Sequence, residues 1–225
     1  SQADFERHVN AAPTKEFIAR LKGGVEGDGP KVTLLRPSPG AVSPGAARSG
    51  QADASLPRGI DHVGLTVPDV DEAARFFEKA FGATAIYDVQ PEGAKPMAGP
   101  DVERELGLPP GAKIVHMRLM RLGKGPSLEL FRIEDAAHSP AAALNDYGWT
   151  HIALYVDDIN AAAKRFEDAG GTLLSPPHGL AGVESGEKNL GLYGKAPWGG
   201  LIELLTYPSG IRYPDPQLTR WTPAR

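Results

Sequence analysis

An internal repeat is the feature that most constrains how this chain can fold. When the sequence is shifted by 89 positions, residues 59–82 align without gaps on residues 148–171, and 11 of the 24 aligned residues are identical. His62 aligns with His151 and Asp69 aligns with Asp158. A repeat of this quality predicts two copies of one small structural unit.

Each copy carries the signals of a strand, a helix and three further strands. A β-rich run leads to Asp69 or Asp158, which we expect to cap a helix, and glycines at 82 and 170–171 supply the helix stop. Strand-like runs then follow, so that each copy predicts a βαβββ module and the chain predicts an α+β fold. These runs are residues 83–89, 113–122 and 126–133 in the first copy and residues 172–176, 189–194 and 200–207 in the second.

A second match completes the repeat near its end. Residues 127–131 (SLELF) resemble residues 201–205 (LIELL) at an offset of 74 positions. The 15-residue difference between the two offsets corresponds to an extra Pro- and Gly-rich loop at residues 90–111 of the first copy. We expect this loop to act as a lid or specificity element.

The repeat also sets the domain boundaries. Residues 58–135 form the first module and residues 136–208 the second, with residues 209–225 as a C-terminal tail. Residues 1–57 form an N-terminal extension with a short helix at 14–22, a short strand at 31–36 and a linker rich in Pro, Gly, Ala and Ser. We interpret the extension as a surface-wrapping or disordered segment, with a role in dimer contacts as the alternative.

The composition narrows the function classes. The chain has 24 basic and 28 acidic residues, and this balance gives no electrostatic reason to expect nucleic acid or a membrane as partner. No apolar run approaches the roughly 18 residues that span a bilayer. Cysteine is absent, so any metal must be held by His, Asp, Glu or backbone oxygen. We expect a cytoplasmic protein. The alternative is an exported protein with a processed N-terminus, because the first residue is Ser1 rather than Met.

Four polar residues take equivalent positions in the two copies. His62 and His151 lie in the first strand of each module, while Glu129 and Glu203 lie in the last strand, between apolar neighbours. A carboxylate inside an apolar strand is costly to bury unless it is paired or binds a cation. We therefore expect the four side chains to converge on one divalent metal ion, which the ligand types leave open among Zn, Ni, Co, Mn and Fe(II).

The two modules resemble a known family. The strand starts DHVGLTV and THIALYV, together with the strands SLELF and GLIELL, are similar to those of the vicinal oxygen chelate superfamily over residues 59–208. That superfamily includes glyoxalase I, methylmalonyl-CoA epimerase and extradiol dioxygenases. The resemblance implies tandem βαβββ modules that form a curved eight-stranded, metal-binding half-barrel, with His62, Glu129, His151 and Glu203 as the metal ligands.

The ligand set separates the branches of this superfamily. Extradiol dioxygenases and fosfomycin-resistance enzymes use two His and one Glu, and bleomycin-resistance proteins lack the metal site. The set found here resembles that of bacterial glyoxalase I and, with one Gln in place of Glu, that of the epimerases. Thr66 and Ile133 stand where glyoxalase I has its glutathione-anchoring Arg and Asn, so the sequence gives no support for glutathione as the substrate.

The resemblance implies a metal-dependent isomerase, epimerase or lyase that acts on a small oxygenated substrate through a metal-stabilised enolate. Glu203 or Glu129 would be the catalytic base that moves the proton. One alternative is an Fe(II)-dependent ring-cleaving or other dioxygenase, and another is a non-catalytic small-molecule binding or resistance protein. The chain could form a homodimer. The two modules would then pair either within one chain or between the two chains of the dimer.

Four other residues carry weaker signals. His116 and Arg118 share a face of their strand, where we expect a solvated outer face, with contact to a substrate anion as the alternative. Trp198 is expected to pack a turn rather than to line a cavity. The pattern assigns no role to Tyr193.

Overall fold

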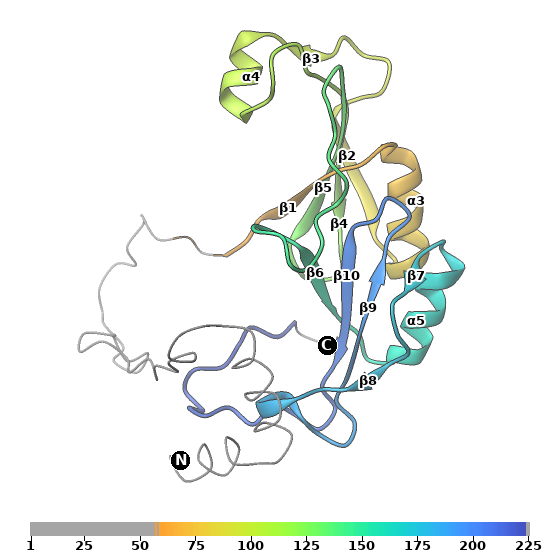
Figure 1. Cartoon of the computed structure of the whole chain (residues 1–225), viewed down its shortest axis with the longest axis vertical. Helices are drawn as coiled ribbons and strands as arrows, with labels where there is room; N and C mark the ends of the chain where they lie inside the picture. The colour runs from red at the N-terminus through yellow and green to blue at the C-terminus, as the bar shows by residue number, and fades with distance from the viewer. Residues whose placement is uncertain (1–56, 58, 224–225) are drawn as a thin grey trace, which may run out of the picture. The chain divides into compact units, whose positions relative to one another are not determined.

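The computed structural model describes residue 57 and residues 59–223. The helix expected at 14–22, the strand expected at 31–36 and the linker that follows them lie outside the described residues. The described chain contains two sheets of five strands each, and the α+β class expected from the sequence is confirmed (Figure 1). Within these residues no helix is long and apolar enough to cross a membrane.

The first module is a sheet with strand order β1-β5-β4-β2, on which the short strand β3 also pairs with β4. Strands β1 and β5 are parallel, whereas β4 pairs antiparallel with both β5 and β2. A helix, α4, lies in the connection that was expected to be a loop. The elements are β1 (His62–Thr66), α3 (Val70–Phe81), β2 (Thr84–Gln90), β3 (Met97–Ala98), α4 (Pro100–Leu106), β4 (Lys113–Arg121) and β5 (Ser127–Glu134).

The second module repeats this topology with strand order β6-β10-β9-β7, and the short strand β8 also pairs with β9. Strands β6 and β10 are parallel, as β1 and β5 are. The eight strands on the two main paths, four in each sheet, match the two expected βαβββ modules. The elements are β6 (His151–Tyr155), α5 (Ile159–Asp168), β7 (Thr172–Leu173), β8 (His178–Gly179), the 3₁₀ turn Gly182–Glu184, β9 (Leu190–Lys195) and β10 (Leu201–Thr206).

The helix caps form as the sequence indicates. The Asp69 carboxylate accepts a hydrogen bond from the Glu72 backbone N–H at 2.8 Å, and the Asp158 carboxylate accepts from two backbone N–H groups of α5. Gly82 ends α3 with φ of 66°, in the left-handed region that glycine adopts without strain. Local capping chemistry therefore fixes where each helix starts, directly after the strand that carries the histidine.

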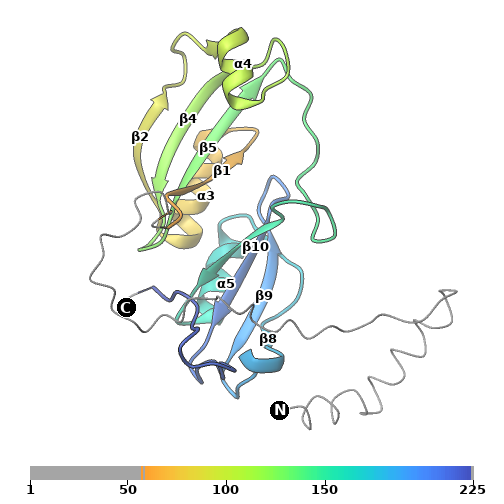
Figure 2. The same ribbon diagram turned by 90° about the vertical axis from the view of Figure 1, so that its left-hand side faces the viewer.

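Helix α3 covers one face of the first sheet and α5 covers one face of the second, and the other face of each sheet stays open (Figure 2). Leu128 and Leu130 of β5 point to the helix side and are fully buried, and Ile202 and Leu204 of β10 do the same in the second module. Side chains alternate along a strand, so Glu129 and Glu203 must lie on the open faces. The burial of the leucine and isoleucine neighbours on the helix side thus directs both carboxylates to the opposite side of their sheets.

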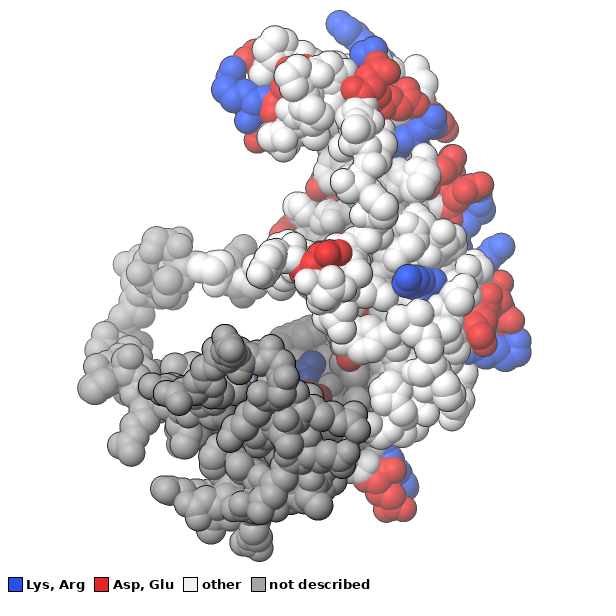
Figure 3. Space-filling model, viewed as in Figure 1, with Lys and Arg blue, Asp and Glu red and all other residues white. Residues whose placement is uncertain are grey.

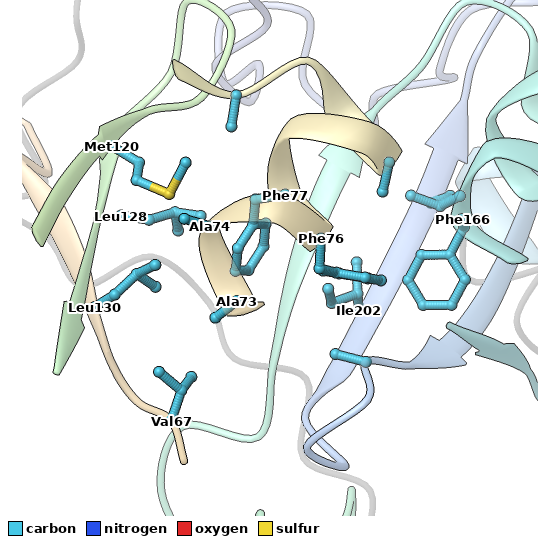
Figure 4. Close-up of a cluster of buried hydrophobic side chains, with 14 of the residues drawn as sticks. Val67, Ala73, Ala74, Phe76, Phe77, Met120, Leu128, Leu130, Phe166 and Ile202 are labelled. Carbon is cyan, nitrogen blue, oxygen red and sulfur yellow. The ribbon is translucent and has the colours of Figure 1, made fainter. Parts of the chain in front are cut away.

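The two modules contact each other through helices α3 and α5, which share one apolar core (Figure 4). Phe76 of α3 meets Phe166 of α5 edge to face, with ring centroids 5.5 Å apart, and meets Trp198 at 5.3 Å. Trp198 therefore packs against the core, as expected, and it also lines a shallow cavity beside α3, which the sequence did not predict. The Arg165 side chain donates to the backbone oxygens of Ala80 and Lys79, at the carbonyl end of α3, where a cation is favoured.

The solvent faces carry charges of both signs. On the face seen in Figure 3, basic and acidic residues lie side by side, and neither sign covers a broad area among the described residues. On α5, for example, Lys164 pairs with Asp168 at 2.6 Å, one helical turn away. Such exposed pairs contribute little to stability, so the apolar core supplies most of it.

Candidate metal centre

The first module brings His62 and Glu129 together across adjacent parallel strands. Glu129 lies opposite Gly64 in the β1–β5 register, and its carboxylate reaches the His62 Nε2 at 3.2 Å. A side chain on Gly64 would stand on the same open face, so the glycine leaves this face clear beside the carboxylate. One imidazole and one carboxylate that are distant in sequence thus form one pair on the sheet.

The other nitrogen of His62 is held by the residue before it. The His62 Nδ1–H donates to the Asp61 carboxylate at 2.8 Å, and this hydrogen bond raises the pKa of His62 above its usual value. A carboxylate on one ring nitrogen orients the imidazole and leaves the opposite nitrogen to bind a cation. In this module, therefore, Nε2 is the atom presented to Glu129.

The second module repeats the pair on its own open face. His151 Nε2 lies 3.5 Å from the Glu203 carboxylate, and His151 Nδ1 hydrogen bonds to the Thr150 hydroxyl at 3.1 Å. Thr150 and Asp61 are equivalent positions of the repeat. Both histidines thus have Nδ1 occupied by the preceding side chain and Nε2 facing a glutamate, so each module directs one imidazole nitrogen and one carboxylate to its open face.

Tyr193 completes the second pair, and the sequence interpretation missed it. Tyr193 lies directly opposite Glu203 in the β9–β10 register, and its ring packs against the His151 ring with centroids 5.4 Å apart. Burial, followed by the hydrogen bond that its hydroxyl donates to Glu203, raises the pKa of Tyr193 to about 12. The signal was present, because the 74-residue offset that relates Glu129 to Glu203 also relates Leu119 to Tyr193.

The structure brings the four expected ligands together in two pairs, one in each module. Among the described residues, three ligand atoms come within 4.8 Å of one another only at Asp71, Glu92 and His116. Because the modules pack through α3 and α5, each pair stays on the open face of its own sheet. A single site that contains all four ligands stays a prediction.

The cluster that includes Asp71 and His116 is an ion-pair network of the first module. Arg118 donates to Asp88 at 2.7 Å and to Asp71 at 2.6 Å, while His116 Nε2 contacts the Asp88 carboxylate at 3.1 Å. The guanidinium lowers the pKa of Asp88 below its usual value. Arg118 pairs with Asp71, and Arg132 donates to Glu92 at 3.0 Å, so the carboxylates that a metal would need already have cationic partners. The cluster therefore fits a structural role joining α3, β2 and β4.

The network corrects one expectation from the sequence. His116 is only 3% exposed and Arg118 is largely buried, so neither side chain forms a solvated outer face. Both point to the helix side of β4, where three carboxylates surround them, and this excludes the alternative of contact with a substrate anion. The two side chains do share one face of β4, as expected, but that face also carries Ile114 and Met120, which are 1% and 0% exposed, so it is the buried face.

A cavity of about 1010 Å³ lies away from both His–Glu pairs. It is bounded by β6, the end of α3, the β4–β5 turn and the C-terminal tail. Arg220 of the tail lies over the rings of Tyr155 and Tyr207, 5.6 and 5.2 Å from their centroids. These contacts hold the tail against the second module.

Comparison with known proteins gives the family. The family model described as the glyoxalase/bleomycin resistance protein/dioxygenase superfamily matches residues 61–186, which is more than half of the chain. The chain belongs to this superfamily. A 2-epi-5-epi-valiolone epimerase from Actinomyces sp. is 33% identical over 159 residues, which cover 68% of this chain and 82% of that protein.

Solved structures of the superfamily share the fold. A glyoxalase family protein from Bacillus cereus matches with a TM-score of 0.54 and 21% identity, over 70% of this chain and 98% of that one. The vicinal-oxygen-chelate resemblance stated from the strand motifs is therefore confirmed. The epimerase among the relatives supports an enzyme of the isomerase type.

Proposed function

We propose that this superfamily member is an epimerase that removes and returns a proton at a carbon next to a carbonyl, with a divalent cation held by His62, Glu129, His151 and Glu203. The observation that carries the proposal is the repeated pair. In both modules the imidazole Nδ1 is held by the preceding residue and Nε2 faces a carboxylate, at 3.2 and 3.5 Å. Two nitrogens and two carboxylate oxygens suit a divalent first-row metal.

The relatives support the reaction class. Sharing 33% identity with a 2-epi-5-epi-valiolone epimerase favours a polyhydroxylated cyclic ketone as the substrate class here too. Glu129 adds a fourth ligand and so favours the isomerase branches over the dioxygenases, because the dioxygenase set that the family resemblance implies has a single Glu. The epimerases of the family have a Gln at this position, and the reaction class is supported here by the relative itself. Both carboxylates are therefore available to handle protons.

The chain's own groups account for the proton steps. One glutamate takes the proton from the substrate carbon, breaking the C–H bond, and the electron pair moves toward the carbonyl. A proton from water then adds to the opposite face of that carbon, and the glutamate releases its proton to solvent. A divalent cation bound at the site would stabilise the negative charge that develops on the carbonyl oxygen. His62 and His151 keep their Nε2 atoms directed at the site because Asp61 and Thr150 hold the other side of each ring.

We further propose that a second copy of the chain completes the centre. The first module of one copy would face the second module of the other, related by a twofold axis, which brings the two pairs together twice in each dimer. Two equivalent apolar side chains support this pairing. Ile60 and Trp149 each lie two residues before the histidine of their module and are 66% and 95% exposed, and burying them would favour association.

The activity is tested directly with 2-epi-5-epi-valiolone. We expect protein loaded with Zn²⁺, Co²⁺ or Mn²⁺ to epimerise it, with incorporation of solvent deuterium at the inverted carbon measured by NMR. Removal of the metal with a chelator should stop both processes, and restoring the metal should recover them. If the metal-loaded protein causes neither epimerisation nor deuterium exchange with this ketone, the proposed function is wrong.

The shared centre is tested by complementation between Glu129→Gln and Glu203→Gln. Each variant alone should be nearly inactive. Mixed dimers contain one site with both substitutions and one site with neither, so refolding the variants together should restore about a quarter of the wild-type activity. Each variant refolded with itself is the control. If mixed dimers form, as shown by two affinity tags, but stay inactive, each site lies within one chain.

A further inference from the structure

The two glutamates of the proposed centre are equally buried but have different neighbours. The side chains of Glu129 and Glu203 are each 17% exposed, so burial alone gives no reason for one to act differently from the other. Directly opposite Glu203 lies Tyr193, and directly opposite Glu129 lies Leu119. Residues that face each other across an antiparallel pair are in side-chain contact, so this exchange changes the surroundings of the carboxylate itself.

Tyr193 touches both members of its pair. Its hydroxyl is placed to donate a hydrogen bond to the Glu203 carboxylate opposite it, and its ring packs at 73° against the His151 ring. A hydrogen bond on one carboxylate oxygen restricts rotation of the side chain and directs the other oxygen. Glu203 is thus oriented before any cation arrives, and leaving its position would break this hydrogen bond.

Glu129 lacks such a restraint. Leu119 has no group that can donate a hydrogen bond. In the part of the chain that the structure describes, the polar partner of Glu129 is His62, at 3.2 Å, and this histidine is itself a proposed ligand. Glu129 can therefore change its position without breaking a hydrogen bond to any supporting residue.

We propose that Tyr193 is a positioning residue that keeps Glu203 as a fixed metal ligand, so that Glu129 is the carboxylate that moves and takes the substrate proton. This inference rests on the proposed metal centre and assigns different roles to its two glutamates. The proton passes from the substrate carbon to a Glu129 carboxylate oxygen, and the electron pair of the broken C–H bond moves toward the neighbouring carbonyl.

The first test removes the hydroxyl and keeps the ring. Tyr193→Phe should still pack on His151, and we expect the affinity of the metal-free protein for Co²⁺, measured by competition with a chromogenic chelator, to fall by about tenfold or more. Thermal unfolding of the metal-free variant checks that the fold is intact. Co²⁺ affinity equal to that of the wild type would overturn the positioning role.

The second test places the same hydroxyl opposite the other glutamate. Leu119→Tyr should restrain Glu129, and Leu119→Phe is the matched control because it adds the ring without the hydroxyl. We expect Leu119→Tyr to bind Co²⁺ at least as tightly as Leu119→Phe but to turn over 2-epi-5-epi-valiolone about tenfold more slowly, as a lower kcat rather than a higher KM. Equal kcat values for the two variants would overturn the assignment of Glu129.

Two further variants test the metal centre by itself, separately from the role of Tyr193. His62→Ala and His151→Ala should each lose most of the Co²⁺ affinity. If both bind Co²⁺ as the wild type does, the metal centre is wrong and the role of Tyr193 fails with it. If both lose affinity and Tyr193→Phe does not, the centre stands and only the role of Tyr193 is rejected.

Discussion

The two modules place a histidine and a glutamate at equivalent points and surround them with different side chains. In the first module a carboxylate, Asp61, holds the histidine, and in the second a hydroxyl, Thr150, does so. Across the sheet, Leu119 faces one glutamate and Tyr193 faces the other. The repeated backbone fixes where the histidines and glutamates stand, and the residues next to them differ between the modules.

The same contrast extends to the contact between each helix and its sheet. In the first module Arg118 joins β4 to α3 through Asp71, whereas the equivalent residue of the second module is Leu192, which is buried in the shared core. The first module thus uses an ion pair where the second uses apolar packing. Each difference can be tested by changing one module and its counterpart in parallel.

The largest expected effect is on the core that the modules share. Phe166 is 1% exposed, and its ring fills the space above two glycines, Gly171 and Gly194, where any Cβ would overlap it. Phe166→Ala should lower the free energy of unfolding by about 3–5 kcal/mol, measured by urea denaturation. Its counterpart Phe77→Ala should have a similar effect, because that ring is fully buried.

The exposed Leu174→Ala is the control for these core variants, and we expect it to change stability by less than about 0.5 kcal/mol. A loss of stability confined to Phe77→Ala, with Phe166→Ala close to the wild type, would contradict a core shared between the modules.

The next effect concerns the residues that hold the two histidines. Asp61→Asn removes a charged acceptor from His62 and should weaken Co²⁺ binding by about 10- to 100-fold. Thr150→Val removes a neutral hydroxyl from His151, and we expect a smaller loss, because hydrogen bonds to charged groups are stronger than those between neutral groups. Chelator competition measures both, and equal losses in the two variants would show that the two supports are equivalent.

The smallest effect is on stability in acid. Arg118 holds the pKa of Asp88 below its value of 3.8 in an unfolded chain, so this carboxylate stabilises the fold above about pH 4, and the contribution is lost as the pH falls through the lower, folded pKa. Asp88→Asn should be less stable than the wild type at neutral pH, by about 1–2 kcal/mol. The difference should shrink as the pH falls below about 4.

Urea denaturation over a pH series measures this effect. Asn160→Ala, which changes the second-module counterpart of Asp71, should leave the acid dependence unchanged. A constant difference between Asp88→Asn and the wild type at every pH would show that Asp88 does not act through its charge.

The sequence predicted the parts of the fold that local chemistry controls. Capping by Asp69 and Asp158, the buried alternation around Glu129 and Glu203 and the repeated βαβββ order are each set by residues close together in the chain. The packing of α3 on α5 was not predicted, because it depends on how Phe76, Phe166 and Trp198 fit in three dimensions.

The surroundings of the candidate site were harder to predict than its ligands. Asp88 lies 30 residues before Arg118 in the chain, and only the β2–β4 register brings them together. Tyr193 went unassigned because the 74-residue offset pairs it with Leu119 but does not show which residue it faces. Its role follows from which residue faces Glu203, and this requires the register of β9 on β10.

Joining two related modules in one polypeptide has a consequence for how such a centre can change over time. If one gene encoded a single module and two identical copies assembled, every substitution would enter both halves of the centre at once. Here a tyrosine could arise beside one glutamate while a leucine stayed beside the other. Tandem duplication therefore allows two glutamates at equivalent positions to acquire different neighbours, and so to take different roles within one site.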